Sequence, residues 1–315
     1  MTDKGSACEK LCAEIRSSGV APNVACGFWT HEAGAVTGGE TDALFDLASV
    51  TKSFFAVACA CARAGLRETM LRGVPLELML AHRAGFPAHL PLFAPLVDGA
   101  RVDFDAAIES AWASRSPLAL PAPPLYSDVG YLLAGHGVAG DRVDDFIRAN
   151  IPSDVMGADV GSARQMDMAR AVPTEHVAWR GGEVRGHVHD ENAWALGGDG
   201  ACGHAGLFGT VASVLRFGAF VLEHMSDFEW LVRERDGGTL RAGFDGKSSE
   251  GSSAGTVLGP RSFGHLGFTG TSVWIDPDAR IVVALLTNRV CPTRDNVKIR
   301  EARPRVHDAL ASLAR

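Results

Sequence analysis

The first fifty residues have a hydrophobic pattern that predicts one helix and two strands. Apolar residues recur every three or four positions over 6–17, ahead of Gly19, as expected for the buried face of a helix that ends at a glycine. Residues 24–30 and 45–48 have strand-like patterns, and the glycines at 38–39 between them predict a turn. This part of the chain is therefore expected to form a helix packed on a sheet.

The middle of the chain has a helical pattern. Residues 49–64 are almost continuously apolar and rich in alanine, which predicts a buried helix. The stretch that follows is rich in proline and carries short helical patterns at 74–81, 104–113, 129–137 and 143–150. We expect residues 65–190 to form a mainly helical insert.

The C-terminal third returns to a pattern that alternates helix and strand. A helix is predicted over 212–223, whereas the polar stretch 226–254 has no clear pattern. Two apolar runs, 271–275 and 281–286, flank an Asp-Pro-Asp turn and predict a hairpin, and a last helix is predicted over 295–313.

These elements predict an α/β (α+β) fold with an antiparallel sheet built from both chain ends and flanked by the terminal helices. Residues 1–64 and 191–315 would form the part made of sheet and helices, and the helical subdomain at 65–190 would be inserted between them. We expect residues 1–315 to form a single catalytic domain.

Composition narrows the class of protein further. With 46% hydrophobic and 21% charged residues, the chain can bury a substantial core, and its net charge of −7 argues against nucleic acid as a partner. The longest apolar stretch, 54–62, is far shorter than the ~20 residues that span a bilayer. The polar start at 1–10 lacks the features of a secretory signal, so the sequence predicts a cytoplasmic protein without a membrane partner.

The seven cysteines agree with that location. Their number is odd and no pair has the CxxC spacing, as expected for buried thiols in a reducing compartment. Cys59 and Cys61 lie two apart on a predicted helix, so they point in different directions and do not jointly bind a metal ion.

The first candidate for chemistry is the pair Ser49 and Lys52 at the start of the buried helix. Residues three apart on a helix share a face, so the amine can reach the hydroxyl and take its proton. Burial favours the neutral amine that this role needs. The spacing itself is weak evidence, because S-x-x-K occurs by chance in many proteins.

The surrounding sequence strengthens the case. Residues 45–52, Phe-Asp-Leu-Ala-Ser-Val-Thr-Lys, resemble the active-site segment of the β-lactamase-like serine hydrolases. Further segments resemble the family's other motifs in the family's order, at 80–87, 126–131, 188–193, 203–208, 264–271 and 287–289. The resemblance implies the β-lactamase/transpeptidase-like fold and a covalent acyl-serine mechanism that needs no cofactor.

The resemblance also implies roles for individual residues. Ser49 would attack a carbonyl carbon, and Lys52 and Tyr126 would share the proton transfers of acylation and deacylation. In the third motif, His265 takes the place of a lysine and is followed by Gly267. The N–H groups of Ser49 and Phe268 would form the oxyanion hole, and the substrate would bind along this segment.

The second motif, Tyr126-Ser127-Asp128, departs from the family pattern. Asp128 stands where the tyrosine-type β-lactamases have asparagine, which weakens the case for β-lactam recognition and adds a carboxylate that favours a charged Lys52. An alternative register aligns Ser127-Asp128-Val129 with the S-D-N motif. We prefer Tyr126 because the sequence at 130–133 matches the tyrosine branch. The connection after Arg63 is shorter than is usual in the family, which predicts a trimmed cleft.

Two further patterns in the sequence correspond to other kinds of site. His187, His189, Asp190 and His204 are potential zinc ligands, but the same stretch matches a part of the family that binds no metal, and we expect these side chains to brace a loop. The G-x-G-x-x-G pattern at 198–203 lacks the preceding strand that a dinucleotide site requires.

The sequence therefore predicts a serine hydrolase for a small-molecule ester or amide, an esterase or amidase, with no metal and no cofactor. A β-lactamase or a D-alanyl-D-alanine-type peptidase is the nearest alternative. An alternative of another class is a penicillin-binding sensor-like module with little turnover. The sequence does not specify an oligomeric state.

Overall fold

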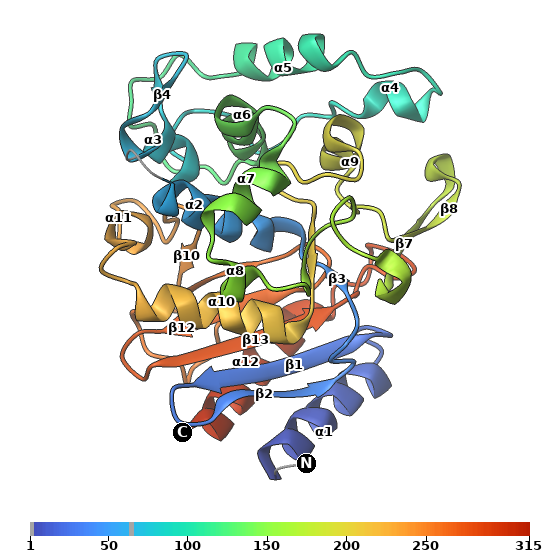
Figure 1. The fold of residues 1–315 in the computed structure, drawn as a ribbon, viewed down its shortest axis with the longest axis vertical. Coiled ribbons are helices and arrows are strands. Elements are labelled where there is room, and N and C mark those ends of the chain that lie inside the picture. The colour runs from blue at the N-terminus through green and yellow to red at the C-terminus, as the bar shows by residue number, and fades with distance from the viewer. Residues whose placement is uncertain (1–2, 63–65) are drawn as a thin grey trace.

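A computed structural model describes residues 3–62 and 66–315 of the chain (Figure 1). Its main sheet has six antiparallel strands in the order β10-β11-β12-β13-β1-β2. The strands are β1 (Val24–Thr30), β2 (Gly34–Gly39), β10 (Asp245–Gly246), β11 (Phe263–Leu266), β12 (Ser272–Asp276) and β13 (Ile281–Thr287). The two chain ends meet in the centre of the sheet, where β1 pairs with β13 from Val24 opposite Thr287 to Thr30 opposite Ile281. The predicted antiparallel sheet from both chain ends is thus confirmed.

Helices cover both faces of this sheet. The terminal helices α1 (Asp3–Ser17) and α12 (Ile299–Ala314) pack on one face, and α10 (Val211–Glu223) packs on the other (Figure 1). Alternate residues of β13 follow this division, since Val283 lies in the cluster with α1 and α12, and Val282 and Ala284 lie in the cluster with α10. All seven residues of β13 are buried, and from Ile281 to Leu286 they are all apolar instead of alternating with polar residues.

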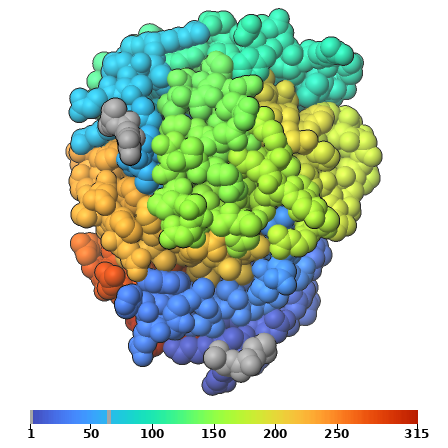
Figure 2. Space-filling view, viewed as in Figure 1, coloured from blue at the N-terminus to red at the C-terminus, as the bar shows by residue number. Residues whose placement is uncertain are grey.

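The second layer of the molecule contains the helices of the middle of the chain. These are α2 (Thr51–Cys61), α3 (Leu76–Leu80), α4 (Ala94–Val97), α5 (Phe104–Ala113), α6 (Asp128–Ala139), α7 (Val143–Asn150), α8 (Ser153–Met156), α9 (Glu191–Gly197) and α11 (Glu229–Val232). In Figure 2 the green middle of the chain lies above the orange and blue segments that carry α10 and the sheet. Among the described residues, no helix has both the length and the apolar character needed to cross a bilayer.

Short strands form smaller sheets outside the main sheet. A three-stranded sheet has the order β3-β9-β6, and two further pairs are β4-β5 and β7-β8. Their bounds are β3 (Phe45–Asp46), β4 (Met70–Leu71), β5 (Val74–Pro75), β6 (Val160–Ser162), β7 (Pro173–Val177), β8 (Gly182–Arg185) and β9 (Leu207–Gly209). The segment 65–190 therefore contains strands as well as helices, and its separation as a subdomain stays a prediction.

The turn predicted at glycines 38–39 is wrong, because both residues belong to β2. Helix α1 crosses this strand so closely that a Cβ atom on Gly38 would lie 2.4 Å from the backbone nitrogen of Glu9 and 2.6 Å from the carbonyl carbon of Cys8. Glycine is needed here for the close approach of the helix and not for a reversal of the chain.

Several predicted bounds also differ. The strand predicted over 45–48 ends at Asp46. A 3₁₀ turn follows at Ala48–Val50. The helix predicted over 49–64 is α2, which ends at Cys61; residues 63–64, with the first part of the connection expected to trim the cleft, lie outside the described residues. The helix predicted from 74 begins at Leu76, after β5. The last helix begins at Ile299 rather than 295, because the carbonyls of Arg294 and Asn296 accept hydrogen bonds from Arg289 in an irregular segment of turns. The helices predicted at 104–113 and 143–150 are confirmed as α5 and α7.

Candidate active site

Ser49 lies in a sharp turn between β3 and α2. The preceding Ala48 has φ +46°, a left-handed conformation that costs an alanine about 1–2 kcal/mol. This turn is held from both sides, since the Ala48 N–H donates to Oδ1 of Asp46 at 2.7 Å and the Leu47 N–H donates to the Leu207 carbonyl at 2.9 Å. The Ser49 side chain is consequently left partly exposed, at a pocket.

Lys52 lies one helical turn further along and is fully buried. Its Nζ donates to Oγ of Ser49 at 2.7 Å and to the His204 carbonyl at 3.2 Å. The same Nζ is 2.7 Å from Oδ1 of Asp128. Burial acts to lower the pKa of this amine, but the Asp128 carboxylate and the Tyr126 hydroxyl outweigh it and raise the pKa above its ordinary value. The Asp128 carboxylate thus favours the charged form of Lys52, whereas burial by itself would favour the neutral amine.

Tyr126 completes the group around Ser49. Its hydroxyl lies close enough to Lys52 and Ser49 for both to act on the pKa of the phenol, and its ring centroid lies 4.9 Å from Nζ of Lys52. Burial raises the pKa of the phenol above its ordinary value, although the charge of Lys52 acts against this. Since Lys52 donates to Ser49, the serine hydroxyl is free to donate to the phenol oxygen.

Ser127 has a different environment from Tyr126. Its Oγ donates to the Pro87 carbonyl at 2.6 Å and accepts from the Gly130 N–H at 2.9 Å, which makes it the N-cap of α6. The side chain is 3% exposed. The geometry thus places Tyr126, and not Ser127, next to Ser49.

The segment that follows β11 is hydrogen-bonded directly to the turn that carries Ser49. Thr269 Oγ1 donates to the Asp46 carbonyl at 2.7 Å, and Thr271 Oγ1 donates to the Leu47 carbonyl at 3.0 Å. The two segments approach so closely that a Cβ atom on Gly267 would lie 2.6 Å from the Leu47 carbonyl oxygen. Side chains larger than glycine at 267 would push the strand away from Ser49.

Phe268 presents its backbone at the mouth of the pocket. Its N–H donates to no acceptor in the part of the chain that the structure describes, and its carbonyl accepts from Nε of Arg289 at 2.8 Å. The ring is half exposed and packs between the guanidinium of Arg289, 4.4 Å from its centroid, and the ring of His189 at 5.7 Å. An unused N–H held in this way is suited to receive an oxyanion.

His265 lies beside Tyr126, with ring centroids 6.0 Å apart, and is buried. Burial, aided by the charge of Lys52, lowers the pKa of His265 to about 3. Nδ1 lies 2.8 Å from the Leu266 carbonyl and so carries the proton of the neutral ring. His265 therefore occupies the place of a lysine without supplying its charge, and its role in substrate binding stays a prediction.

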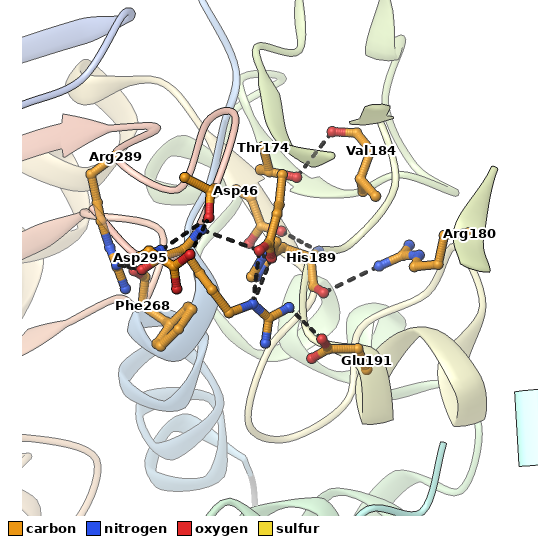
Figure 3. A network of polar contacts seen from close by, with 12 residues as sticks. Asp46, Thr174, Arg180, Val184, His189, Glu191, Phe268, Arg289 and Asp295 are labelled. Carbon is orange, nitrogen blue, oxygen red and sulfur yellow. Dashed lines mark hydrogen bonds and ion pairs between the residues drawn. The ribbon is translucent and has the colours of Figure 1, made fainter. Parts of the chain in front are cut away.

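A network of polar contacts links Asp46, which precedes the turn that carries Ser49, to His189 and the segments around it (Figure 3). Oδ2 of Asp46 accepts from the His189 N–H at 2.7 Å, and Nε2 of His189 lies 2.8 Å from Oε2 of Glu175. Burial acts to raise the pKa of Glu175, but hydrogen bonds from His189 and Arg294 lower it to about 2. Arg294 also pairs with Glu191. These residues come from four distant segments, and no local pattern in the sequence indicates that they meet.

His82 is a second residue whose role the sequence did not reveal. It has φ +59°, and its Nδ1 accepts the Ser127 N–H at 2.9 Å. Its carbonyl accepts the Leu125 N–H at 3.0 Å, and its ring packs on that of Tyr126 at 4.7 Å. Burial lowers the pKa of His82 well below its ordinary value, so the ring is neutral and able to accept. His82 thus holds the segment that carries Tyr126.

The pocket in front of Ser49 has a volume of about 480 Å³, enough for a small ligand. Ser49, Tyr126, Asp128, Gly267 and Phe268 all line it. It is also lined by four arginines, Arg289, Arg294, Arg300 and Arg303.

Comparison with known proteins agrees with this geometry. The Beta-lactamase family matches residues 29–307. The chain belongs to the β-lactamase family. A curated relative named "Putative D-alanyl-D-alanine carboxypeptidase", from Escherichia coli strain K12, is 25% identical over 249 residues, which cover 67% of this chain and 56% of that protein. The chain thus spans about half the length of the curated relatives it matches first.

Solved structures of the β-lactamase family share the fold. A β-lactamase from Mycobacterium bovis superposes with a TM-score of 0.67 at 20% identity, over 96% of this chain and 99% of that one. A D-amino acid amidase from Ochrobactrum anthropi superposes with a TM-score of 0.70 at 16% identity, over 99% of both chains. The family and the fold predicted from the sequence are confirmed.

Within this β-lactamase-family site the candidate zinc ligands do not converge. His189 pairs with Glu175, His204 pairs with Asp190 at 2.9 Å, and His187 pairs with Asp199 at 2.9 Å. Each histidine has its own carboxylate, and the pairs formed by His189 and His204 reach the pocket in front of Ser49 through His189 and Asp190. The glycine-rich stretch at 198–203 follows helix α9 and precedes the short strand β9.

Proposed function

We propose that the chain is a serine hydrolase that cleaves a small ester or amide through an acyl-serine intermediate. The observation that carries the proposal is the 2.7 Å contact between the buried Lys52 amine and the Oγ of a Ser49 that faces a pocket. A serine in this setting has a cation to stabilise its alkoxide and space for a substrate in front of it.

In this mechanism Ser49 Oγ attacks the carbonyl carbon and passes its proton to the Tyr126 oxygen. Tyr126 in turn gives its own proton to the leaving group, so the phenol acts as a relay and ends neutral. Lys52 keeps its proton throughout and stabilises the negative charge that develops on Ser49 and Tyr126. In deacylation a water molecule takes the place of the leaving group, and the same relay runs in reverse.

The negative charge on the carbonyl oxygen needs its own donors. The N–H groups of Ser49 and Phe268 would form the oxyanion hole, and the unused N–H of Phe268 supports this assignment. The contacts of Arg289 with the carbonyl and the ring of Phe268 would hold that N–H in place. The route supplies its own nucleophile and requires neither metal nor cofactor.

A peptidase is the second candidate. The relatives named as D-alanyl-D-alanine carboxypeptidases and the arginines that line the pocket favour a substrate with a carboxylate. Asp128, which accepts but does not donate hydrogen bonds, favours an ester or amide other than a β-lactam. The cytoplasmic location expected from the sequence stays a prediction.

Turnover decides between an enzyme and a sensor that is acylated once. A panel of p-nitrophenyl esters, D-alanyl peptides and a chromogenic cephalosporin, assayed with the full chain and with Ser49→Ala, tests the proposal. We expect ester hydrolysis to exceed cephalosporin hydrolysis and to vanish in the variant. A single stoichiometric burst with every substrate would instead identify a sensor.

A further inference from the structure

The carboxylate of Asp128 has one oxygen inside the protein and one that is available to a ligand. Oδ1 is buried and lies 2.7 Å from Nζ of Lys52. Oδ2 accepts no hydrogen bond from any residue that the structure describes, and the side chain is 24% exposed where Asp128 lines the pocket. Because Oδ1 is covered, the accessible part of the side chain lies at Oδ2.

Asp128 is also close to the reacting atoms. Lys52 joins it to Ser49 through two contacts of 2.7 Å each, so a single amine separates the carboxylate from the nucleophile. In the acyl-serine state of the proposed function, on which this inference rests, the acyl carbon is bonded to Oγ of Ser49. A group attached next to that carbon comes within reach of Asp128.

The chemistry of a carboxylate limits what that group can be. An ionised carboxylate accepts hydrogen bonds and donates none. A carbonyl oxygen placed against Oδ2 would leave two acceptors facing each other, whereas an amine would form a charge-assisted hydrogen bond. The two histidines near Lys52 add no competing positive charge, because burial lowers the pKa of both His82 and His265.

We propose that Asp128 is a specificity-determining residue, which selects substrates whose acyl part carries a free amine next to the scissile carbonyl. The substrate class is thus an ester or amide of an amino acid with an unblocked amino group. Substrates acylated on that nitrogen are disfavoured, because they present a carbonyl oxygen in the same region.

The variant Asp128→Asn replaces the hydrogen-bond acceptor that faces the pocket with a donor. Nζ of Lys52 is a donor, so the asparagine must turn its carbonyl oxygen toward Lys52. The NH₂ group then takes the position of Oδ2 and offers a donor to the pocket. The variant is nearly isosteric, and the hydrogen bond from the N–H of residue 128 to the Ala88 carbonyl, at 2.9 Å, does not involve the side chain.

Three methyl esters of similar shape measure the preference. Alanine methyl ester carries the amine, N-acetylalanine methyl ester carries the blocked amine, and methyl isobutyrate has a methyl group in the same position and serves as the reference. The full chain should prefer the alanine ester over the isobutyrate by at least roughly tenfold in kcat/KM in one chiral series, the size expected of a charge-assisted hydrogen bond. Asp128→Asn should lose this preference and turn over the N-acetyl ester faster than the alanine ester.

A matched control uses another carboxylate of the pocket. Glu191 already pairs with Arg294, so Glu191→Gln should keep the wild-type order of the three esters. The same acyl groups offered as amides should compete with fluorophosphonate labelling of Ser49 in the same order, which provides a reading that does not depend on fast turnover.

The outcomes separate this inference from the proposed function. A ratio of amine to blocked amine that is the same in the wild type and in Asp128→Asn, with Ser49 still labelled, overturns the role of Asp128 alone. Failure to label Ser49 overturns the proposed function and the inference together. Reversal of the ratio in Asp128→Asn, but not in Glu191→Gln, supports the inference.

Discussion

The amine of Lys52 and the carboxylate of Asp128 form an ion pair, with Nζ and Oδ1 2.7 Å apart, and the same Nζ donates to Oγ of Ser49 at 2.7 Å. The carboxylate raises the pKa of Lys52 above its ordinary value at a position where burial by itself would lower it, and so favours the charged amine. In the proposed mechanism the proton of Ser49 therefore moves through Tyr126.

The ion pair predicts a specific pH dependence. Because Asp128 raises the pKa of Lys52, the cation that stabilises the Ser49 alkoxide persists to high pH, and kcat/KM should fall only as pH rises above the ordinary lysine range. In Asp128→Asn, burial becomes the main influence and lowers the pKa. The alkaline limb of the pH profile of kcat/KM should then move to lower pH. An alkaline limb at the same pH in both proteins would contradict a cationic Lys52.

The ion pair also predicts how the free energy of unfolding changes with pH. A lysine whose pKa is higher in the folded state contributes stability that is present below its unfolded pKa and is lost as pH rises through the folded value. Urea unfolding of the wild type should therefore show this contribution at neutral pH and lose it at strongly alkaline pH. The variant Lys52→Met, which removes the charge and leaves Asp128 buried without a partner, should be less stable at neutral pH.

Lys52 and Tyr126 should act as one unit with Ser49. Acid and base steps contribute about 10² to 10⁴ to the rate, so Lys52→Ala and Tyr126→Phe should each lose at least roughly a hundredfold in kcat/KM. Residues that share one proton path are strongly non-additive, and the double variant should fall little below the worse single one. If the losses multiplied, or if Ser127→Ala abolished activity while Tyr126→Phe kept it, the assigned relay would be wrong.

His82 should act as a positioning residue for Tyr126. In His82→Asn the amide oxygen can accept the Ser127 N–H, and asparagine tolerates the left-handed backbone at φ +59°. His82→Leu leaves that N–H buried without a partner, at a cost of about 1–3 kcal/mol. We expect the leucine variant to lose at least roughly tenfold in kcat with little change in KM, and the asparagine variant to recover most of it. Equal activity of the two variants would show that the hydrogen bond does not matter.

Activity should not depend on a metal ion. The histidines that the sequence made candidates for zinc each pair with a separate carboxylate, and the acyl-serine route provides its own nucleophile. Dialysis against a strong chelator should leave ester turnover unchanged. A complete loss that zinc restores would revive the metal hypothesis.

The sequence predicted those features that depend on local spacing. Ser49 and Lys52 are three apart on a helix, and this spacing alone places them on one face. Tyr126 is too distant along the chain for spacing to place it, and only the resemblance to the family indicated its role. The glycine at 38 was misread because glycine favours turns, whereas here it allows α1 to approach β2.

Features built from distant segments could not be predicted in this way. One example is the group formed by Asp46, Glu175, His189 and Arg294, which meet only because distant segments pack together. In the sequence, nothing distinguishes any of the four from an ordinary polar residue. The charged form of Lys52 was expected only through the family resemblance, because Asp128 lies on another helix and no local spacing brings it to the amine.

The central claim is that Ser49 is the nucleophile, and covalent labelling tests it most directly. A fluorophosphonate reacts with an activated serine, so mass spectrometry after digestion should find one label, in the peptide that contains residues 45–63. The label should be absent from Ser49→Ala, which removes only the hydroxyl. Labelling that persists in Ser49→Ala, or that falls on a different serine in the wild type, would contradict the account.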